Sequence, residues 1–313
     1  MTIIASVSDH PAVPLDVLAG DDVVDVLDPI DSDQAALLPE KYYSNSVTSV
    51  KDQGSNGTCW AFSSVAAMEA NAFKKGIDSP DGSAPDFSET ALSWYTYNNL
   101  QGFTDGGRSY FVGLQAIKWV GPVWENGLYN GFPIYYPLNS LPSESLFDSD
   151  FAVSRDAAHV AGVRMVNSSD VEHVKMPIYQ MGAGSMALGW NAQWMTDNPG
   201  SDGRYAYNAA GPSKSGHAVT VIGWDDSYSA SNFKALCRPS SDGAWLVKNS
   251  WGAAVDDAPY FWVSYETTAR YELNVVFFDM EPVLNRGEHA AGRKGLCGRL
   301  AFSVVGDDRG KYI

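Results

Sequence analysis

The sequence predicts an α+β protein in which the helices come early and the strands come late. The strongest helical pattern spans residues 59–75, where apolar residues recur at Phe62, Ala66, Ala70 and Phe73. After about residue 180 the pattern changes to short segments that are rich in β-branched and aromatic residues and are separated by Gly, Asp, Asn and Ser. Helices and strands that are segregated in this way are typical of α+β folds.

Length and composition limit the class of protein. The chain has 313 residues, 45% of them hydrophobic and 19% charged, which is enough for one large core or two smaller ones that share an interface. No apolar run approaches the roughly 18 to 20 residues of a membrane-spanning helix, so we expect a soluble globular protein. The formal charge of −16 argues against binding to nucleic acid or to anionic membranes, because little would neutralise a phosphate backbone.

Composition also divides the chain into three parts. The first 40 residues carry nine acids and no Lys or Arg, and we expect residues 1–37 to be a short pro-segment or a disordered arm. They lack the basic start and the apolar stretch of a secretory signal. Residues 38–284 have the composition of one folded domain. Residues 285–313 gain basic residues and lose periodicity, which indicates a tail or the truncated start of a further module.

The individual elements follow from local signals. The first helix, Cys59–Lys75, ends in two lysines and Gly76, as helices often do. A second helix is expected at Asp170–Gln180, where Pro177 favours an early end. The Gly-rich run at 182–187 is interpreted as a turn, because it follows a helix, which is the reverse of a dinucleotide-binding loop. Strands are expected at Met186–Trp190, Ala218–Trp224, Ala244–Val247, Tyr260–Tyr265 and Leu273–Phe278.

Cys59 is the first candidate for chemistry. It stands at the start of the strongest helix, where unpaired N–H groups and the helix dipole lower a thiol pKa that is otherwise about 8.5. On position alone, a small buried hydrophobe is an equally good interpretation. The chain has three cysteines, so at least one lacks an intramolecular disulfide partner.

A reactive thiol needs a base and a group that orients the base. Of the five histidines, His217 has the best setting, because it precedes an apolar strand and has small neighbours. Asn249 ends the next predicted strand and can hold the imidazole in one tautomer. The order Cys, His, Asn is therefore present along the chain.

Three blocks of sequence resemble the papain-like cysteine peptidases of the C1 family. They are QGSNGTCWAF, SGHAVTVIGW and WLVKNSWG, and they stand in the order of that family's active-site blocks. The resemblance extends to Leu38–Pro39, Asp86–Leu92 and Asp105–Gly107 and covers about residues 38–280. The overall pattern is most similar to bacterial members that often precede a lectin-like module.

The resemblance implies a two-lobe fold and a cysteine-type endopeptidase. A helical lobe at about 55–150 would pack against an antiparallel, barrel-like β lobe at about 150–280, with the cleft between them. Cys59 would be the nucleophile that forms an acyl-thioester, and His217 its ion-pair partner and later proton donor. Asn249 would orient His217, and Gln53 would bind the oxyanion.

The resemblance also implies the substrate contacts. Gly106 and Gly107 would pair with the substrate backbone, and Arg108 follows them directly. Ala218 would line the site, and Trp251 would cover the hydrogen bond between His217 and Asn249. We expect peptide or protein substrates, no metal and no cofactor. The resemblance also implies a secreted or cell-surface location, and the oligomeric state is left open.

Departures from the family leave alternatives. Asn56 and Thr104 stand where many members have a disulfide, and Gly216 stands where many have Asp or Asn. The connection from Asp225 to Gly243, which holds Cys237, is interpreted as a surface insertion. One alternative is acyl transfer by the same residues, as in transglutaminase-like enzymes. Another is a non-catalytic adhesion or binding protein on the same scaffold.

Overall fold

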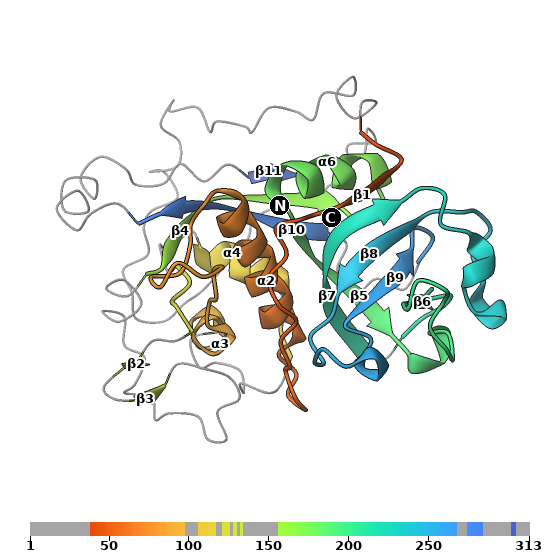
Figure 1. The fold of residues 1–313 in the computed structure, drawn as a ribbon, viewed down its shortest axis with the longest axis horizontal. Coiled ribbons are helices and arrows are strands. Elements are labelled where there is room, and N and C mark those ends of the chain that lie inside the picture. Colours follow the sequence, from red (N-terminus) through yellow and green to blue (C-terminus); the bar gives the residue numbers. More distant parts are fainter. Residues whose placement is uncertain are drawn as a thin grey trace, which may run out of the picture.

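A computed structural model describes nine stretches of the chain, shown in Figure 1. They are residues 38–97, 106–116, 121–125, 128–129, 132–133, 156–213, 215–267, 274–283 and 302–304. The predicted arm at 1–37 therefore lies outside the described residues. Of the predicted tail at 285–313, only 302–304 are described.

A large mixed sheet forms one side of the molecule. In the described parts of the chain it has nine strands in the order β11-β4-β10-β5-β7-β8-β9-β6, and β1 pairs with β7 beside this path. The pairing is antiparallel except at β6–β9 and β11–β4. The strands are β1 (Lys41–Tyr43), β4 (Ala158–Asn167), β5 (Gly184–Trp190), β6 (Tyr205–Tyr207), β7 (Ser215–Asp225), β8 (Ala244–Lys248), β9 (Tyr260–Ser264), β10 (Asn274–Pro282) and β11 (Phe302–Val304).

Figure 1 shows α3 and α4 across α2 from β7, whereas α6 lies beside β1 and β11. Helix α2 packs against α3 and α4 and also against β5, β7 and β10. The helices are α2 (Cys59–Lys74), α3 (Glu89–Tyr97), α4 (Ser109–Ala116) and α6 (Val171–Met181). Short 3-10 turns are η2 (Ala192–Trp194), η3 (Ala230–Asn232), η4 (Ala235–Cys237) and η5 (Val255–Asp257), and a small hairpin joins β2 (Leu128–Tyr129) to β3 (Phe132–Pro133). The predicted α+β architecture with two lobes is confirmed.

Helix α2 lies in the core of the molecule, between the two lobes. Its residues from Trp60 to Ala72 are all buried, although a surface helix exposes one face to water. One apolar cluster joins α2 to β4 and β10, and includes Val163, Phe278 and Met280. A second cluster fills the space between α6 and the sheet, with Trp224 and Trp245 fully buried. The helix that begins at Cys59 is thus held from both lobes.

The structure corrects several local predictions. Helix α6 does not end early, because Pro177 lies inside it and is buried with Val174 and Ile178. The run at 182–187 is a turn only at its start, since β5 begins at Gly184. The connection after Asp225 is not a simple surface insertion, because it contains η3 and η4 and its Cys237 is 3% exposed.

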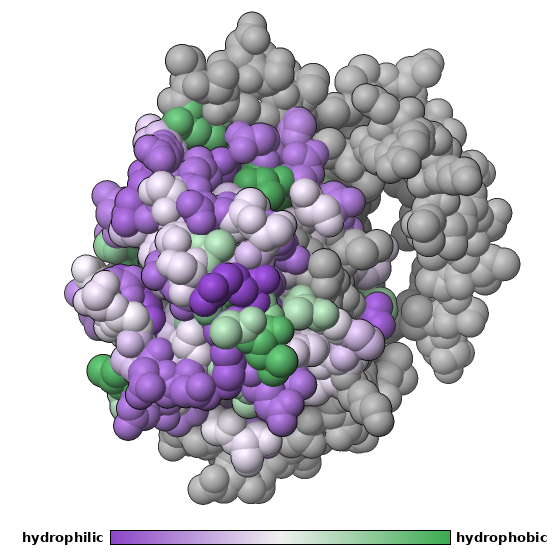
Figure 2. Space-filling model, turned by 90° about the vertical axis from the view of Figure 1, so that its right-hand side faces the viewer, coloured by the Kyte–Doolittle hydropathy of each residue, from purple (hydrophilic) through white to green (hydrophobic). Residues whose placement is uncertain are grey.

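The outer surface of the sheet lobe is polar. The face in Figure 2 is largely hydrophilic and carries small, separated apolar patches. None of the described helices has the length and apolar character needed to cross a membrane.

Candidate active site

The thiol of Cys59 lies at an uncapped helix start. Cys59 is the first residue of α2, and the side chain of the preceding Thr58 makes no capping hydrogen bond. The Thr58 hydroxyl is instead buried without a partner, and the first turn of α2 contains no acid. The first turn of α2 thus offers neither an acid nor a side-chain cap, and its N-terminal dipole favours the thiolate.

His217 and Asn249 form a hydrogen bond whose direction the structure defines. His217 Nε2 lies 2.8 Å from Asn249 Oδ1, while Asn249 Nδ2 donates to the carbonyls of Asp257 and Ala258 at 3.3 Å and 3.2 Å. Because the amide nitrogen is the donor there, Oδ1 is the acceptor and Nε2 carries the hydrogen. Nδ1 is then the ring nitrogen that exchanges a proton with another group.

The loop between β8 and β9 positions Asn249. The residue follows β8, and its N–H donates to the Pro259 carbonyl at 2.9 Å, just before β9. Ala258 has a φ of +48°, the one positive value outside glycine in the described chain. The left-handed conformation costs a β-carbon residue about 1 to 2 kcal/mol. This unfavourable conformation occurs at the residue whose carbonyl accepts a hydrogen bond from the Asn249 amide.

His217 is buried among aromatic rings. It is 5% exposed, and Trp251 stacks on it with ring centroids 4.5 Å apart at 22°. Trp190 forms a T-shaped contact with it, with ring centroids 5.3 Å apart. Burial lowers the pKa of His217 to about 4, although the Asn249 hydrogen bond acts to raise it. Without a nearby anion the imidazole is therefore neutral at neutral pH.

Contacts between α2 and β7 hold the helix of Cys59 against the strand of His217. Ser63, one turn after Cys59, donates to the carbonyl of Val219, two residues after His217, at 2.7 Å. Lys74, the last residue of α2, lines a groove together with β1, and β1 pairs with the C-terminal end of β7. The C-terminal ends of α2 and β7 therefore lie close together. The two elements thus run in the same direction. One helical turn is about 5.4 Å and two strand residues about 6.6 Å, so the backbones of Cys59 and His217 lie at similar distances along the two elements from this hydrogen bond.

Gln53 lies beside these residues with both ends of its amide held. Its Nε2 donates to the carbonyl of Asn56 at 2.8 Å, and its Oε1 accepts from the Ser250 hydroxyl at 2.7 Å. Its backbone N–H donates to the Ser250 carbonyl. Ser250 follows Asn249 directly, so the loop before α2 is joined to the turn that holds Asn249.

Gly106, Gly107 and Arg108 precede α4 on the helical side. Gly106 has a φ of +89°, which favours glycine. A Cβ on Gly107 would lie 2.3 Å from the ring of Trp60, the neighbour of Cys59, so a larger residue does not fit. Arg108 is exposed. The structure thus places Gly107 against Trp60, the second residue of α2.

Ala218 lies in the apolar cluster beside Cys59, and Trp251 lies on His217. Ala218 is 4% exposed and belongs to the same apolar cluster as Trp60, against which Cys59 packs. Trp251 is half-buried over His217. Within the described stretches, no three His, Cys, Asp or Glu side chains are grouped to hold a metal ion.

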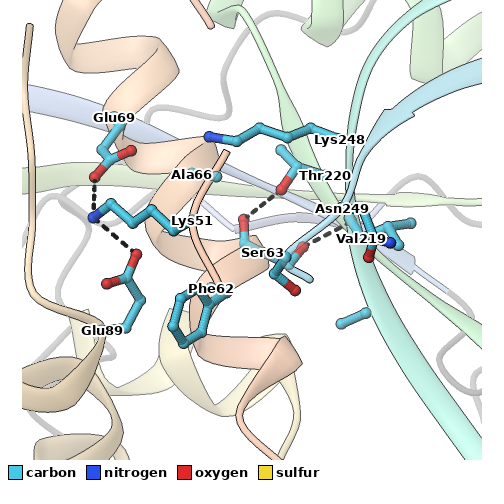
Figure 3. A pocket seen from close by; sticks show the side chains of 12 residues that line it. Lys51, Phe62, Ser63, Ala66, Glu69, Glu89, Val219, Thr220, Lys248 and Asn249 are labelled. Carbon is cyan, nitrogen blue, oxygen red and sulfur yellow. Dashed lines mark hydrogen bonds and ion pairs between the residues drawn. The ribbon is translucent and has the colours of Figure 1, made fainter. Parts of the chain in front are cut away.

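A buried cluster of charges behind the site was not anticipated from the sequence. Lys51 forms ion pairs with four carboxylates at 2.7 to 3.0 Å, two of which are visible in Figure 3. The carboxylates are those of Glu69, Asp86, Glu89 and Glu125. Lys248, directly before Asn249, donates to Thr48 at 3.0 Å, and Thr48 donates to Glu69 at 2.5 Å.

Burial shifts the pKa values in this cluster. It raises the pKa of Glu89 to about 8 and that of Glu125 to about 7, although Lys51 acts in the opposite direction. Burial also lowers the pKa of Lys248. One sequence signal was available: Glu69 stands inside the apolar run AAMEANAF, where a charge needs a buried partner.

A chain of hydroxyl groups crosses the interface between the helices and the sheet, and no pattern in the sequence predicted it. Ser185 on β5 lies 2.6 Å from both Ser63 on α2 and Ser109 at the start of α4. All three side chains are buried. They connect the helix of Cys59 to the segment that follows the paired glycines.

Comparisons with known proteins agree with this geometry. The family model described as papain family cysteine protease matches residues 39–277. Cathepsin L of Sarcophaga peregrina is 27% identical over 215 residues, which cover 68% of this chain and 54% of that protein. Digestive cysteine proteinase 3 of Homarus americanus is 25% identical and is covered to 58%. The chain thus spans a little over half the length of these curated relatives.

Solved structures show the same fold. The protease and lectin-like domains of Cwp84, a surface layer associated protein of Clostridium difficile, match with a TM-score of 0.63 and 25% identity over 79% of this chain and 53% of that one. Bromelain of Ananas comosus matches with a TM-score of 0.52 and 20% identity over 77% of this chain and 99% of its own. The predicted resemblance, including that to a bacterial protease with a lectin-like domain, is confirmed.

Proposed function

Because the chain belongs to the papain family of cysteine proteases, we propose that it hydrolyses peptide bonds in peptide or protein substrates, with Cys59 as the nucleophile. The observation that carries this proposal is the hydrogen bond from His217 Nε2 to Asn249 Oδ1. This hydrogen bond leaves Nδ1 for proton exchange with Cys59, and the helix that begins at Cys59 is hydrogen-bonded to the strand of His217 through Ser63 and Val219.

The first half of the proposed reaction forms a thioester. Nδ1 of His217 holds the thiol proton, and the Cys59 thiolate attacks the carbonyl carbon, so that one C=O electron pair moves to oxygen. The backbone N–H of Cys59 and the fixed amide of Gln53 stabilise the oxyanion. When the C–N bond breaks, the amine leaves with the proton from His217.

The second half releases the acid. Water attacks the thioester while Nδ1 of His217 takes its proton, and the tetrahedral intermediate collapses with cleavage of the C–S bond. The released thiolate of Cys59 again pairs with the protonated His217. No proton is gained or lost by the enzyme over the cycle.

The neighbouring residues would bind and shield. We assign Gly106 and Gly107 to backbone pairing with the substrate, with Arg108 and Ala218 beside them. Trp251, stacked on His217, would keep water from the hydrogen bond to Asn249.

The test uses a mixture of unstructured peptides and the full chain. Wild type and Cys237→Ala are expected to cleave, and Cys59→Ala to show no cleavage above background. Added amines would appear in the products if the chain were an acyl transferase. Cleavage by Cys59→Ala, or intact peptides with all three proteins, would contradict the proposal; the latter result would favour a binding protein.

A further inference from the structure

The segment between Gln53 and Cys59 contains an Asn-Gly pair, Asn56–Gly57. The segment forms a turn and a bend before α2, and it belongs to no helix or strand. Gly54 has a φ of +61°, and both Asn56 and Gly57 are partly exposed. Water therefore reaches the pair.

The backbone at Asn56 holds the amide that is the candidate oxyanion donor. Gln53 Nε2 donates to the Asn56 carbonyl at 2.8 Å, and Gln53 Oε1 accepts from the Ser250 hydroxyl. The Gln53 side chain is buried, with 6% of the residue exposed. A change in the chain path at Asn56 therefore removes one of the two hydrogen bonds that fix this amide.

An Asn-Gly pair can react with itself. The backbone nitrogen of Gly57 loses its proton and attacks Cγ of Asn56, and the new N–Cγ bond closes a five-membered imide. The Cγ–Nδ2 bond breaks, and the nitrogen leaves as ammonia with the proton. Glycine has no Cβ to hinder the attack. Among the described residues, no hydrogen bond holds the Gly57 N–H in place.

Water then opens the imide and leaves aspartate or isoaspartate at position 56. The two steps consume one water, release one ammonia and involve no oxidation. In isoaspartate the main chain runs through the former side chain and gains one methylene, and the carbonyl that accepted from Gln53 becomes a free carboxylate. This negative charge stands three residues before Cys59, and a negative charge near a thiol raises its pKa.

We propose that Asn56–Gly57 is a spontaneous deamidation site, and that the reaction limits how long the enzyme keeps Gln53 in position to bind the oxyanion. The effect on activity rests on the proposed function, whereas the modification itself does not. The reaction needs only water, and it becomes faster as pH rises because the attacking nitrogen must lose its proton. The active form therefore has a lifetime that its own sequence limits.

The chemistry is measured in Cys59→Ala, which cannot digest itself. The full chain is held at pH 5 and at pH 8, and its peptides are mapped by mass spectrometry. Asn56 is expected to give two products of equal mass, aspartate and isoaspartate, faster at pH 8 than at pH 5. Two other Asn-Gly pairs, at 126–127 and 130–131, lie outside the described residues and are followed as separate peptides.

Activity is measured in wild type whose Cys59 thiol is blocked as a mixed disulfide during the incubation and is restored with a reductant. The isoaspartate form, separated by ion exchange, is expected to have a kcat about 10²- to 10³-fold below that of the unmodified protein, which is the loss typical of one oxyanion donor. KM should change little. The activity of the mixture should fall in proportion to the isoaspartate fraction.

Two variants serve as controls. In Asn56→Gln the imide would need a six-membered ring, and in Gly57→Ala a Cβ hinders the attacking nitrogen. The φ of Gly57 is not positive, so alanine fits its backbone conformation. Each variant is compared with its own activity before incubation and should keep it for longer than wild type.

The outcomes separate the two proposals. An Asn56 that stays intact at pH 8 in Cys59→Ala would overturn the inference, as would an isoaspartate form with the kcat of the unmodified protein or an Asn56→Gln variant that loses activity as fast as wild type. These results leave the proposed peptidase activity intact. A wild type without initial activity would contradict the proposed function and the limited lifetime, while the mapping in Cys59→Ala still decides whether the site reacts. If Asn56→Gln does not fold, Gly57→Ala takes its place.

Discussion

Replacing Cys59 with Ala tests how the buried imidazole obtains its charge. Burial lowers the pKa of His217 to about 4, against an ordinary value of about 6.5. This lowering corresponds to roughly 3 kcal/mol against the imidazolium. In wild type, the thiolate at the start of α2 must offset at least this amount if the pair is charged at neutral pH. Cys59→Ala removes that anion and leaves the Asn249 hydrogen bond in place.

The assay is a pH titration of the histidine ring signals by NMR, with His217 assigned from a His217→Gln sample. In Cys59→Ala the His217 midpoint is expected near 4, because burial is then opposed only by the hydrogen bond to Asn249. In wild type the ring should stay protonated at least two units higher. Cys237→Ala, which removes a thiol 20 residues away in sequence, should titrate like wild type. Midpoints that agree within half a unit between wild type and Cys59→Ala would refute the reasoning.

Three further predictions concern neighbouring groups. Asn249→Ala leaves the Nε2 hydrogen of His217 buried without its acceptor, which costs about 1 to 3 kcal/mol and should lower kcat/KM about 5- to 150-fold; an unchanged value would exclude the orienting role. Gln53→Ala should lower kcat about 10²- to 10³-fold with little change in KM, and a loss below threefold would argue against an oxyanion role. Burial raises the pKa of Glu89 to about 8, so the native state keeps a proton that the unfolded state loses above pH 4.5, and stability falls as pH rises through 8. In urea unfolding measured between pH 5 and 8, the free energy of unfolding of Glu89→Gln should fall less steeply with pH than that of wild type, by up to about 1.4 kcal/mol per pH unit. A slope identical to that of wild type would contradict the assigned protonation.

The helix and the order of the site residues were accessible from the sequence because their signals are local. Helical spacing and the lysine-rich end place the predicted helix within one residue of α2, at Lys75 against the observed Lys74. Cys59, His217 and Asn249 each stand at the end of a periodic segment. A strand or helix end is a place where a side chain meets both solvent and the rigid scaffold.

Other features depend on contacts that no local pattern shows. Strand β4 was not predicted, because its sequence AHVAGVRMVN lacks strict alternation and its pairing partner β10 comes more than 100 residues later. Pro177 argued for an early helix end, yet packing of α6 into the core outweighs the lost hydrogen bond. Lys51 and its carboxylates are far apart along the chain, so their cluster exists only once the fold has formed.

The most direct test of the central claim, a thiolate at Cys59 paired with His217, is the pH dependence of alkylation by iodoacetamide, followed site by site with peptide mapping. Cys59 is expected to react rapidly near pH 6, well below the ordinary thiol pKa of about 8.5, and to lose this advantage in His217→Ala. Cys237 is the internal control, because burial raises the pKa of its thiol and leaves it 3% exposed. A Cys59 that reacts only with the pH profile of an ordinary thiol, unchanged in His217→Ala, would contradict the account.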